Sequence, residues 1–183
     1  EVVRACEVRA FVTIRDLRDV MISRYYHVMA DPTHWQHRVI KDLPVKNGFI
    51  RSLYGTDKHP EHPIRYFSDW VSNHVRSSLP IIRYEEYHQD SQDYIAKVAE
   101  YAGIPTTKKT IAQIHQVLSA QKETQMKFGL KSNLSRPGRK KTTMRKGVIG
   151  GWRDFFCEEI SEAFMHEAAD ALLKSGYEVS TDS

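Results

Sequence analysis

Apolar side chains change their spacing near residue 15, and this change predicts a strand that leads into a helix. Residues 8–14 form a short run rich in β-branched and aromatic side chains, which favours a buried strand. The next apolar residues recur every three or four positions, the period of a helix: Leu17, Val20, Met21, Tyr25 and Val28. Asp16 and Asp19 would lie in the first turn of that helix, where carboxylates complement the helix dipole.

The rest of the chain predicts a second strand and further helices. The second strand is expected over residues 79–84. Two segments are expected to be irregular, since 31–63 is rich in proline and 131–146 lacks an apolar period. The further helices are expected over 64–77, 91–102 and 107–122, with a last one whose apolar stripe runs from 155 to 172.

Strands that alternate with helices predict an α/β fold with a parallel sheet flanked by helices. Two strands do not make a stable sheet of this kind, so the remaining strands are expected ahead of residue 1. The chain begins with neither Met nor the apolar segment of a signal peptide, which favours the interior of a longer protein. We therefore expect residues 1–183 to be the C-terminal part of a single domain.

Composition and charge exclude several classes of protein. The 183 residues carry a net charge of +4, and no apolar run approaches the ~20 residues that a membrane-spanning helix needs. Cys6 and Cys157 are the only cysteines and lie far apart, which excludes a disulfide scaffold and fits a reducing cytoplasm. The histidines in 34–37 and 59–62 lack partners at metal-ligand spacing, so no metal site is expected.

Arg15 and Ser23 are the first candidates for a binding site. Arg15 follows a predicted strand, at the edge where open α/β sheets bind ligands, and Ser23 lies two turns into the next helix. A guanidinium and a hydroxyl can clamp a phosphate, because arginine matches phosphate geometry with two hydrogen bonds. On the residues alone, the favoured explanation is an ordinary surface ion pair of Arg15 with Asp16 or Asp19, with Ser23 as an ordinary polar residue of the helix face.

A basic segment and an aromatic residue are the other candidates. Residues 136–146 hold no carboxylate, and Arg145, Lys146 and Gly147 at their end could surround an anion with side chains and backbone N–H groups. The alternatives are a solvated loop or a patch that binds nucleic acid through counterion release. Tyr84, at the end of the second strand, could lie against a base or simply pack in the core.

Three segments, taken in order, resemble the sulfotransferases that use 3′-phosphoadenosine 5′-phosphosulfate (PAPS). Residues 12–26 are similar to the family's 3′-phosphate motif, a strand followed by Arg-x-x-x-Asp-Val-x-x-Ser. Residues 83–87 are similar to its middle signature, a strand that ends in Tyr-Glu-Asp. Residues 145–156 are similar to its late signature, Arg-Lys-Gly-x-x-Gly-Asp-Trp with a later Phe, and Phe164 falls where the family favours another.

The resemblance implies a P-loop-type sulfotransferase fold, with PAPS as co-substrate and adenosine 3′,5′-bisphosphate (PAP) as product. The sulfuryl group would pass to a hydroxyl or amine of an acceptor. Residues implied for nucleotide binding are Arg15, Ser23, Tyr84, Arg145, Lys146 and Gly147. The tyrosine would contact the adenine, and the others would hold the 3′-phosphate.

The chain departs from the family's pattern in several places. The family's phosphosulfate loop with its Lys, and its His general base, precede the 3′-phosphate motif. Both are therefore expected upstream of residue 1, and the chain alone is expected to bind nucleotide without turnover. Gly151 stands where the family has Asp before Trp152. The family's dimerisation signature is not evident at 140–143, so no dimer is predicted from it.

The acceptor is expected to be a small molecule, carbohydrate or lipid, and residues 31–63 are expected to form part of its binding site. The protein is expected to be cytoplasmic. Two alternatives stay open: an inactive relative that keeps the nucleotide half-site, and a nucleic-acid-binding module that uses the basic loop 131–146. The modest net charge and the absence of aromatic side chains in the basic stretch disfavour nucleic acid. The late motif disfavours a P-loop kinase.

Overall fold

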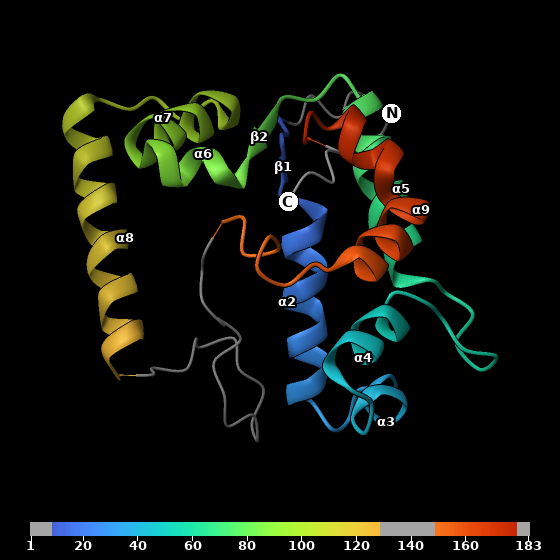
Figure 1. Ribbon diagram of the computed structural model, residues 1–183. Helices are drawn as coiled ribbons and strands as arrows, with labels where there is room; N and C mark the ends of the chain where they lie inside the picture. Colours follow the sequence, from blue (N-terminus) through green and yellow to red (C-terminus); the bar gives the residue numbers. More distant parts are fainter. Residues whose placement is uncertain (1–8, 129–148, 179–183) are drawn as a thin grey trace. The chain divides into compact units, whose positions relative to one another are not determined.

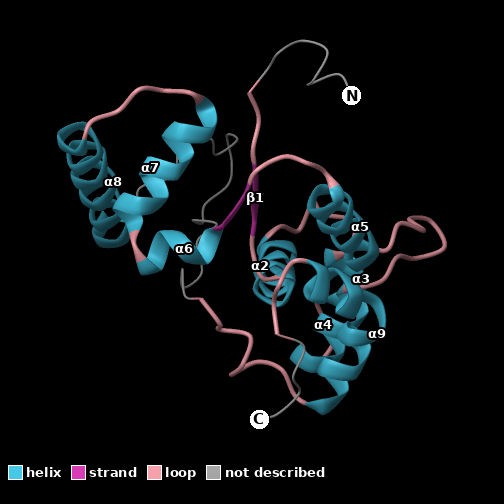
Figure 2. Ribbon diagram, turned by 90° about the horizontal axis from the view of Figure 1, so that it is seen from above, coloured by secondary structure: helices cyan, strands magenta, loops and turns pink. Residues whose placement is uncertain are grey.

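The computed structural model describes residues 9–128 and 149–178 (Figures 1 and 2). The chain forms two compact units, and each unit is built from two separate stretches of sequence. The first unit comprises Glu1–Ile14 and Ser78–Met144, and the second comprises Arg15–Ser77 and Arg145–Ser183. The predicted basic loop 131–146 lies outside the described residues.

The first unit holds a parallel pair of strands, β1 (Val12–Ile14) and β2 (Ile81–Arg83). In the register, Val12 lies opposite Ile81 and Ile14 opposite Arg83. The parallel pairing confirms the α/β prediction. Both strands are shorter than the sequence pattern indicated. In β2 the strand ends at Arg83, because α6 begins at Tyr84.

Three helices complete the described part of the first unit: α6 (Tyr84–Gln89), α7 (Ser91–Ala102) and α8 (Lys108–Phe128). Asp90 is the N-cap of α7, and its side chain accepts hydrogen bonds from two backbone N–H groups of the first turn at 3.0 Å. Gly103 is the C-cap, and its φ of +69° favours glycine. α7 matches the predicted helix 91–102, and α8 covers the predicted helix 107–122 but continues to Phe128. The six-residue α6 was not predicted.

The second unit is helical in its described residues. Its elements are α2 (Leu17–Ala30), α3 (His37–Ile40), α4 (Val45–Ser52), α5 (Pro63–Arg76) and α9 (Glu158–Lys174). α5 and α9 lie side by side in Figures 1 and 2, although about a hundred residues separate them in the sequence. The segment 31–63, predicted to be irregular, contains the two short helices α3 and α4.

The core of the second unit joins α2, α4, α5 and α9. Phe49 of α4 is fully buried and packs edge to face on Phe155, with the ring centroids 5.0 Å apart. Phe164 of α9, also fully buried, packs on Phe156 at 5.3 Å. Burying a side chain of this size stabilises a fold by about 1.5–3 kcal/mol. These aromatic contacts therefore fix the turn around residues 150–156 against the helices.

None of the described helices has both the length and the apolar character needed to cross a membrane.

Candidate functional site

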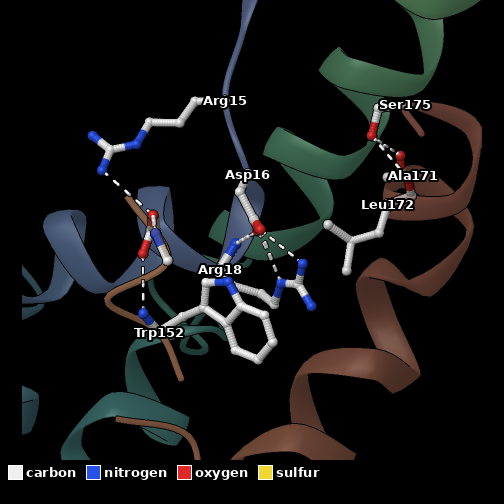
Figure 3. A network of polar contacts seen from close by, with 9 residues as sticks. Arg15, Asp16, Arg18, Trp152, Ala171, Leu172 and Ser175 are labelled. Atoms are coloured by element: carbon white, nitrogen blue, oxygen red, sulfur yellow. Dashed lines mark hydrogen bonds and ion pairs between the residues drawn. The ribbon is translucent and has the colours of Figure 1, made fainter. Parts of the chain in front are cut away.

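α2 begins with Asp16 as its N-cap, and the same carboxylate binds the side chain of Arg18 (Figure 3). Asp16 Oδ1 accepts a hydrogen bond from the Arg18 backbone N–H at 2.9 Å, and Oδ2 accepts one from Arg18 Nη2 at 2.7 Å. Asp16 is 6% exposed and Arg18 is 2% exposed. Each charge depends on the other, since an unpaired charge at this depth is strongly unfavourable.

The indole of Trp152 lies against the Arg18 guanidinium (Figure 3). The Arg18 Cζ atom is 3.6 Å from the ring centroid, and Arg153 approaches the same ring at 4.6 Å. A cation over an indole contributes about 0.5–2 kcal/mol. The turn that carries Trp152 is therefore held to the start of α2 by a side-chain stack.

A second buried carboxylate, Asp19, holds the backbone of the same turn. Its Oδ2 accepts a hydrogen bond from the N–H of Gly150 at 2.8 Å, and its Oδ1 accepts one from the N–H of Trp152 at 3.1 Å. Oδ2 also lies 3.6 Å from Nη2 of Arg15, four residues earlier in the sequence. Both oxygens of Asp19 therefore have partners. One carboxylate links Arg15 to the turn at Gly150–Trp152, which we call the late turn.

Burial is the largest influence on the protonation of Asp19. Its side chain is 4% exposed, and this desolvation raises the pKa of the carboxyl above its ordinary value. The two backbone N–H groups and Arg15 act in the opposite direction, while the neighbouring Asp16 adds to the increase. An ionised carboxylate at this position therefore costs stability that the contacts offset only in part.

The two predicted phosphate residues lie just before α2 and within it. Arg15 precedes the N-cap Asp16, and its Nη2 lies 3.6 Å from Asp19 Oδ2, whereas Ser23 lies on α2 one turn after Asp19. The Arg15 side chain is 26% exposed and Ser23 is exposed, so both are open to solvent. Asp19 lies between them, buried under the late turn.

Tyr84 lies at the carboxyl end of β2, where the sequence placed it, and is the first residue of α6. It is half-buried and packs edge to face on His88, with the ring centroids 5.0 Å apart. It belongs to the first unit, whereas Arg15 and Ser23 belong to the second. Arg145, Lys146 and Gly147 lie outside the described residues.

A different polar network surrounds Arg24 in the second half of α2. Arg24 Nη2 donates to Gln36 Oε1 at 2.5 Å, and Nη1 donates to the Ser52 carbonyl at 3.2 Å. Gln36 Nε2 donates in turn to the carbonyls of Ser52 and Tyr54, both at 3.0 Å. Burial lowers the pKa of Arg24 to about 10, so it stays protonated at neutral pH. This network ties Gln36 and the backbone at Ser52 to α2.

Sequence reasoning missed the role of Asp19 in holding the late turn. It treated this residue as a first-turn carboxylate or as a surface partner of Arg15. The available signal was its spacing, four residues after Arg15 and four before Ser23. In the residues that the structure describes, no three His, Cys, Asp or Glu side chains gather in a way that could hold a metal ion.

The fold defines an α/β protein in which a strand of a parallel pair runs directly into a helix. A model of the sulfotransferase domain matches residues 5–175 of the chain. The chain therefore belongs to the sulfotransferase family, which confirms the family prediction.

Known relatives cover most of this chain but extend well beyond it. Human sulfotransferase 2B1 is 26% identical over 153 residues, 82% of this chain and 40% of that protein. The 3-beta-hydroxysteroid sulfotransferase of Cavia porcellus is 26% identical over 160 residues, 82% of this chain and 51% of that protein. The chain spans about half the length of the curated relatives it matches.

A solved structure of a mouse sulfotransferase complexed with PAP has the same fold. It aligns with a TM-score of 0.63 at 16% sequence identity, covering 96% of this chain and 65% of that one. At this identity the likeness shows the fold, and it confirms the predicted sulfotransferase architecture.

Proposed function

We propose that this chain supplies the 3′-phosphate and adenine part of the PAPS site of a sulfotransferase. In this proposal one residue just before α2, one residue within α2 and the Arg-Lys-Gly of the late motif bind the 3′-phosphate, while one residue at the end of β2 contacts the adenine. These residues are Arg15, Ser23, Arg145, Lys146, Gly147 and Tyr84.

The observation that carries the proposal is the partly exposed Arg15 just before α2, which contacts Asp19, together with the exposed Ser23 one turn after Asp19 on the helix. Asp19 also accepts a hydrogen bond from the late turn. A guanidinium fork suits the oxygens of a phosphate, and a hydroxyl can donate one more hydrogen bond. The chemistry of these donors therefore fits an anion such as the 3′-phosphate. Membership of the sulfotransferase family identifies PAPS as the nucleotide in this proposal.

The proposed reaction is direct transfer of a sulfuryl group. An acceptor oxygen attacks the sulfur of PAPS, the bond from sulfur to the 5′-phosphate oxygen breaks, and PAP leaves. The acceptor gives its proton to a base, for which we propose no described residue of this chain. Arg15 and Ser23 would act far from the sulfur, where binding energy orients the nucleotide and so favours the in-line geometry.

Calorimetric titration with PAP and with 5′-AMP tests the 3′-phosphate site, because the two nucleotides differ only in that phosphate. We expect the chain to prefer PAP. Replacing Arg15 by Ala should lower that preference by about 1.5–3 kcal/mol, roughly 10- to 150-fold, which is the range for a hydrogen bond to a charged group. Arg38→Ala is the matched control, since Arg38 is an exposed arginine in the same unit.

Equal binding of both nucleotides that weakens steeply with salt would contradict the proposal and indicate a general polyanion patch. A thermal melt of the same samples separates this outcome from an unfolded chain. A preference for PAP that Arg15→Ala leaves intact would show that other residues bind the 3′-phosphate.

The proposal extends to the acceptor and the compartment. A small molecule with a hydroxyl group is supported by the name of the steroid sulfotransferase relative. A cytoplasmic location is supported by Cys157, an exposed thiol outside any disulfide in the part of the chain that the structure describes. Sulfate transfer from PAPS to a panel of alcohols, measured on the full-length protein, tests the acceptor class.

A further inference from the structure

Asp19 occupies an unusual position among the groups proposed to bind phosphate. Its carboxylate is buried, yet it contacts Arg15 on one side and two backbone N–H groups of the late turn on the other. Within the second unit it is thus the shared partner of Arg15 and of Gly150 and Trp152.

An uncharged isostere could not replace these contacts. An asparagine has one acceptor atom on its side chain, and its amide nitrogen would face an N–H group of Gly150 or Trp152. It would also leave Arg15 without the charge that lies 3.6 Å from Nη2. The geometry therefore requires a carboxylate, although its burial disfavours the charged form.

We propose that Asp19 is a positioning residue for binding of the nucleotide's 3′-phosphate. It holds Arg15 just before α2 and fixes the Gly150–Trp152 turn. The guanidinium is therefore already positioned for the phosphate before the nucleotide binds. This inference rests on the proposed function, because it assumes that Arg15 binds the 3′-phosphate.

Electrostatic repulsion alone predicts that Asp19 weakens nucleotide binding, the opposite of a positioning role. A carboxylate near a bound phosphate repels it, so removing the charge of Asp19 should strengthen PAP binding if its field is all that matters. If Asp19 acts by positioning Arg15 and the late turn, the same change should weaken PAP binding. The sign of the change therefore distinguishes the two roles.

The first experiment titrates PAP and 5′-AMP into the wild-type chain, Asp19→Asn and Asp154→Asn. We expect Asp19→Asn to reduce the preference for PAP about tenfold and to leave the affinity for 5′-AMP within about twofold, since a lost charge-assisted contact has an effect of this order. Asp154→Asn is the matched control, because Asp154 is an exposed carboxylate two residues after Trp152. It should keep the wild-type preference.

The second experiment measures amide hydrogen exchange by NMR. In Asp19→Asn the amides of Gly150 and Trp152 should exchange faster, while those of α9 should keep their wild-type rates if the fold is intact. In the wild-type chain, PAP should slow exchange at Gly150 and Trp152 more than 5′-AMP does. This wild-type comparison keeps the test decisive even if Asp19→Asn does not fold.

Faster exchange together with a lower preference for PAP would support the inference. A preference that is unchanged or higher in Asp19→Asn would overturn it, as would equal weakening of both nucleotides together with a lower melting temperature. PAP and 5′-AMP with the same effect on the wild-type amides would overturn it too. A wild-type chain that shows no preference for PAP would contradict the proposed function itself. The titration of the wild-type chain alone gives that result, so the two failures are distinguishable.

Discussion

The two halves of α2 each hold an arginine in buried polar contacts, but the partners of the two arginines differ in charge. We call the first group the N-terminal network: Arg15, Asp16, Arg18, Asp19, Gly150 and Trp152. We call the second the Gln36 network: Arg24, Gln36, Ser52 and Tyr54. The first pairs two arginines with two carboxylates, whereas the acceptors of the second are an amide oxygen and backbone carbonyls.

This difference shows which network can respond to a ligand. An anion changes the electrostatic energy of nearby charges, so a phosphate bound at Arg15 would directly change the energy of the charged side chains in the N-terminal network. The Gln36 network is bound to neutral acceptors and ties segments of backbone together. We therefore expect its loss to lower stability, and the loss of Asp19 to change ligand binding.

The largest effect is expected from Arg18→Met, which leaves Asp16 buried without its partner. The free energy of unfolding should fall by about 3–5 kcal/mol, measured by urea denaturation. The double variant Asp16→Asn/Arg18→Met should lose less, because Asn still caps α2 and no buried charge remains. Equal losses in the two variants would show that the isolated carboxylate is not the cause.

Arg24→Met breaks the Gln36 network and should cost about 2–3 kcal/mol of unfolding free energy, because Gln36 Oε1 loses a donor in a buried place. Arg38→Met, at an exposed position, should change stability by less than about 0.5 kcal/mol. The preference for PAP over 5′-AMP should stay at the wild-type level in Arg24→Met. A reduced preference would remove the distinction between the two networks.

Gly150→Ala tests the backbone of the late turn. Gly150 has a φ of +70°, so an alanine there should cost about 1–2 kcal/mol, measured by thermal or urea denaturation. A Cβ at this position would meet Arg153 Nη1 at 2.5 Å, but that flexible side chain can move away. Gly151→Ala is the control, since Gly151 has no positive φ, and it should change stability by less than about 0.5 kcal/mol.

The smallest effect is expected in the pH dependence of stability. Because the folded state raises the pKa of Asp19, the wild-type chain should lose stability relative to Asp19→Asn as the pH rises through that raised pKa. The relative stability of the wild type should be greatest below the unfolded pKa of 3.8. Urea midpoints of both proteins across the acidic range measure this difference, and a trend of opposite sign would show that the contacts outweigh desolvation.

Much of the fold could be predicted from apolar spacing, because the long helices have one-sided patterns and clear ends. α7 is the best example, since Asp90 and Gly103 mark its two ends as they appear in the sequence. α3, α4 and α6 have 4, 8 and 6 residues, too few for a helical period to stand out. Packing on the rest of the molecule, which no local pattern reports, stabilises such short helices.

The site could be predicted only in part. Arg15 and Ser23 were predicted from their spacing and their place after a strand, and their role in binding stays a prediction. The hydrogen bonds of Asp19 could not be found in this way, because its donors are backbone N–H groups and every residue except proline has one. The pairing of Arg18 with Asp16 was missed because the pattern gave no sign that α2 buries two charges in its first turn.

The discontinuous second unit also has a consequence for how the protein is made. Its core needs α9 to cover α5, and Arg65 and Glu167, which join these helices, are 102 residues apart. At about 5–20 residues per second, the ribosome takes roughly 5–20 s to synthesise the intervening chain. During this time the apolar faces of α2, α4 and α5 are exposed without their last partner. Until α9 emerges from the ribosome, we therefore expect the nascent protein to be prone to aggregation through these faces.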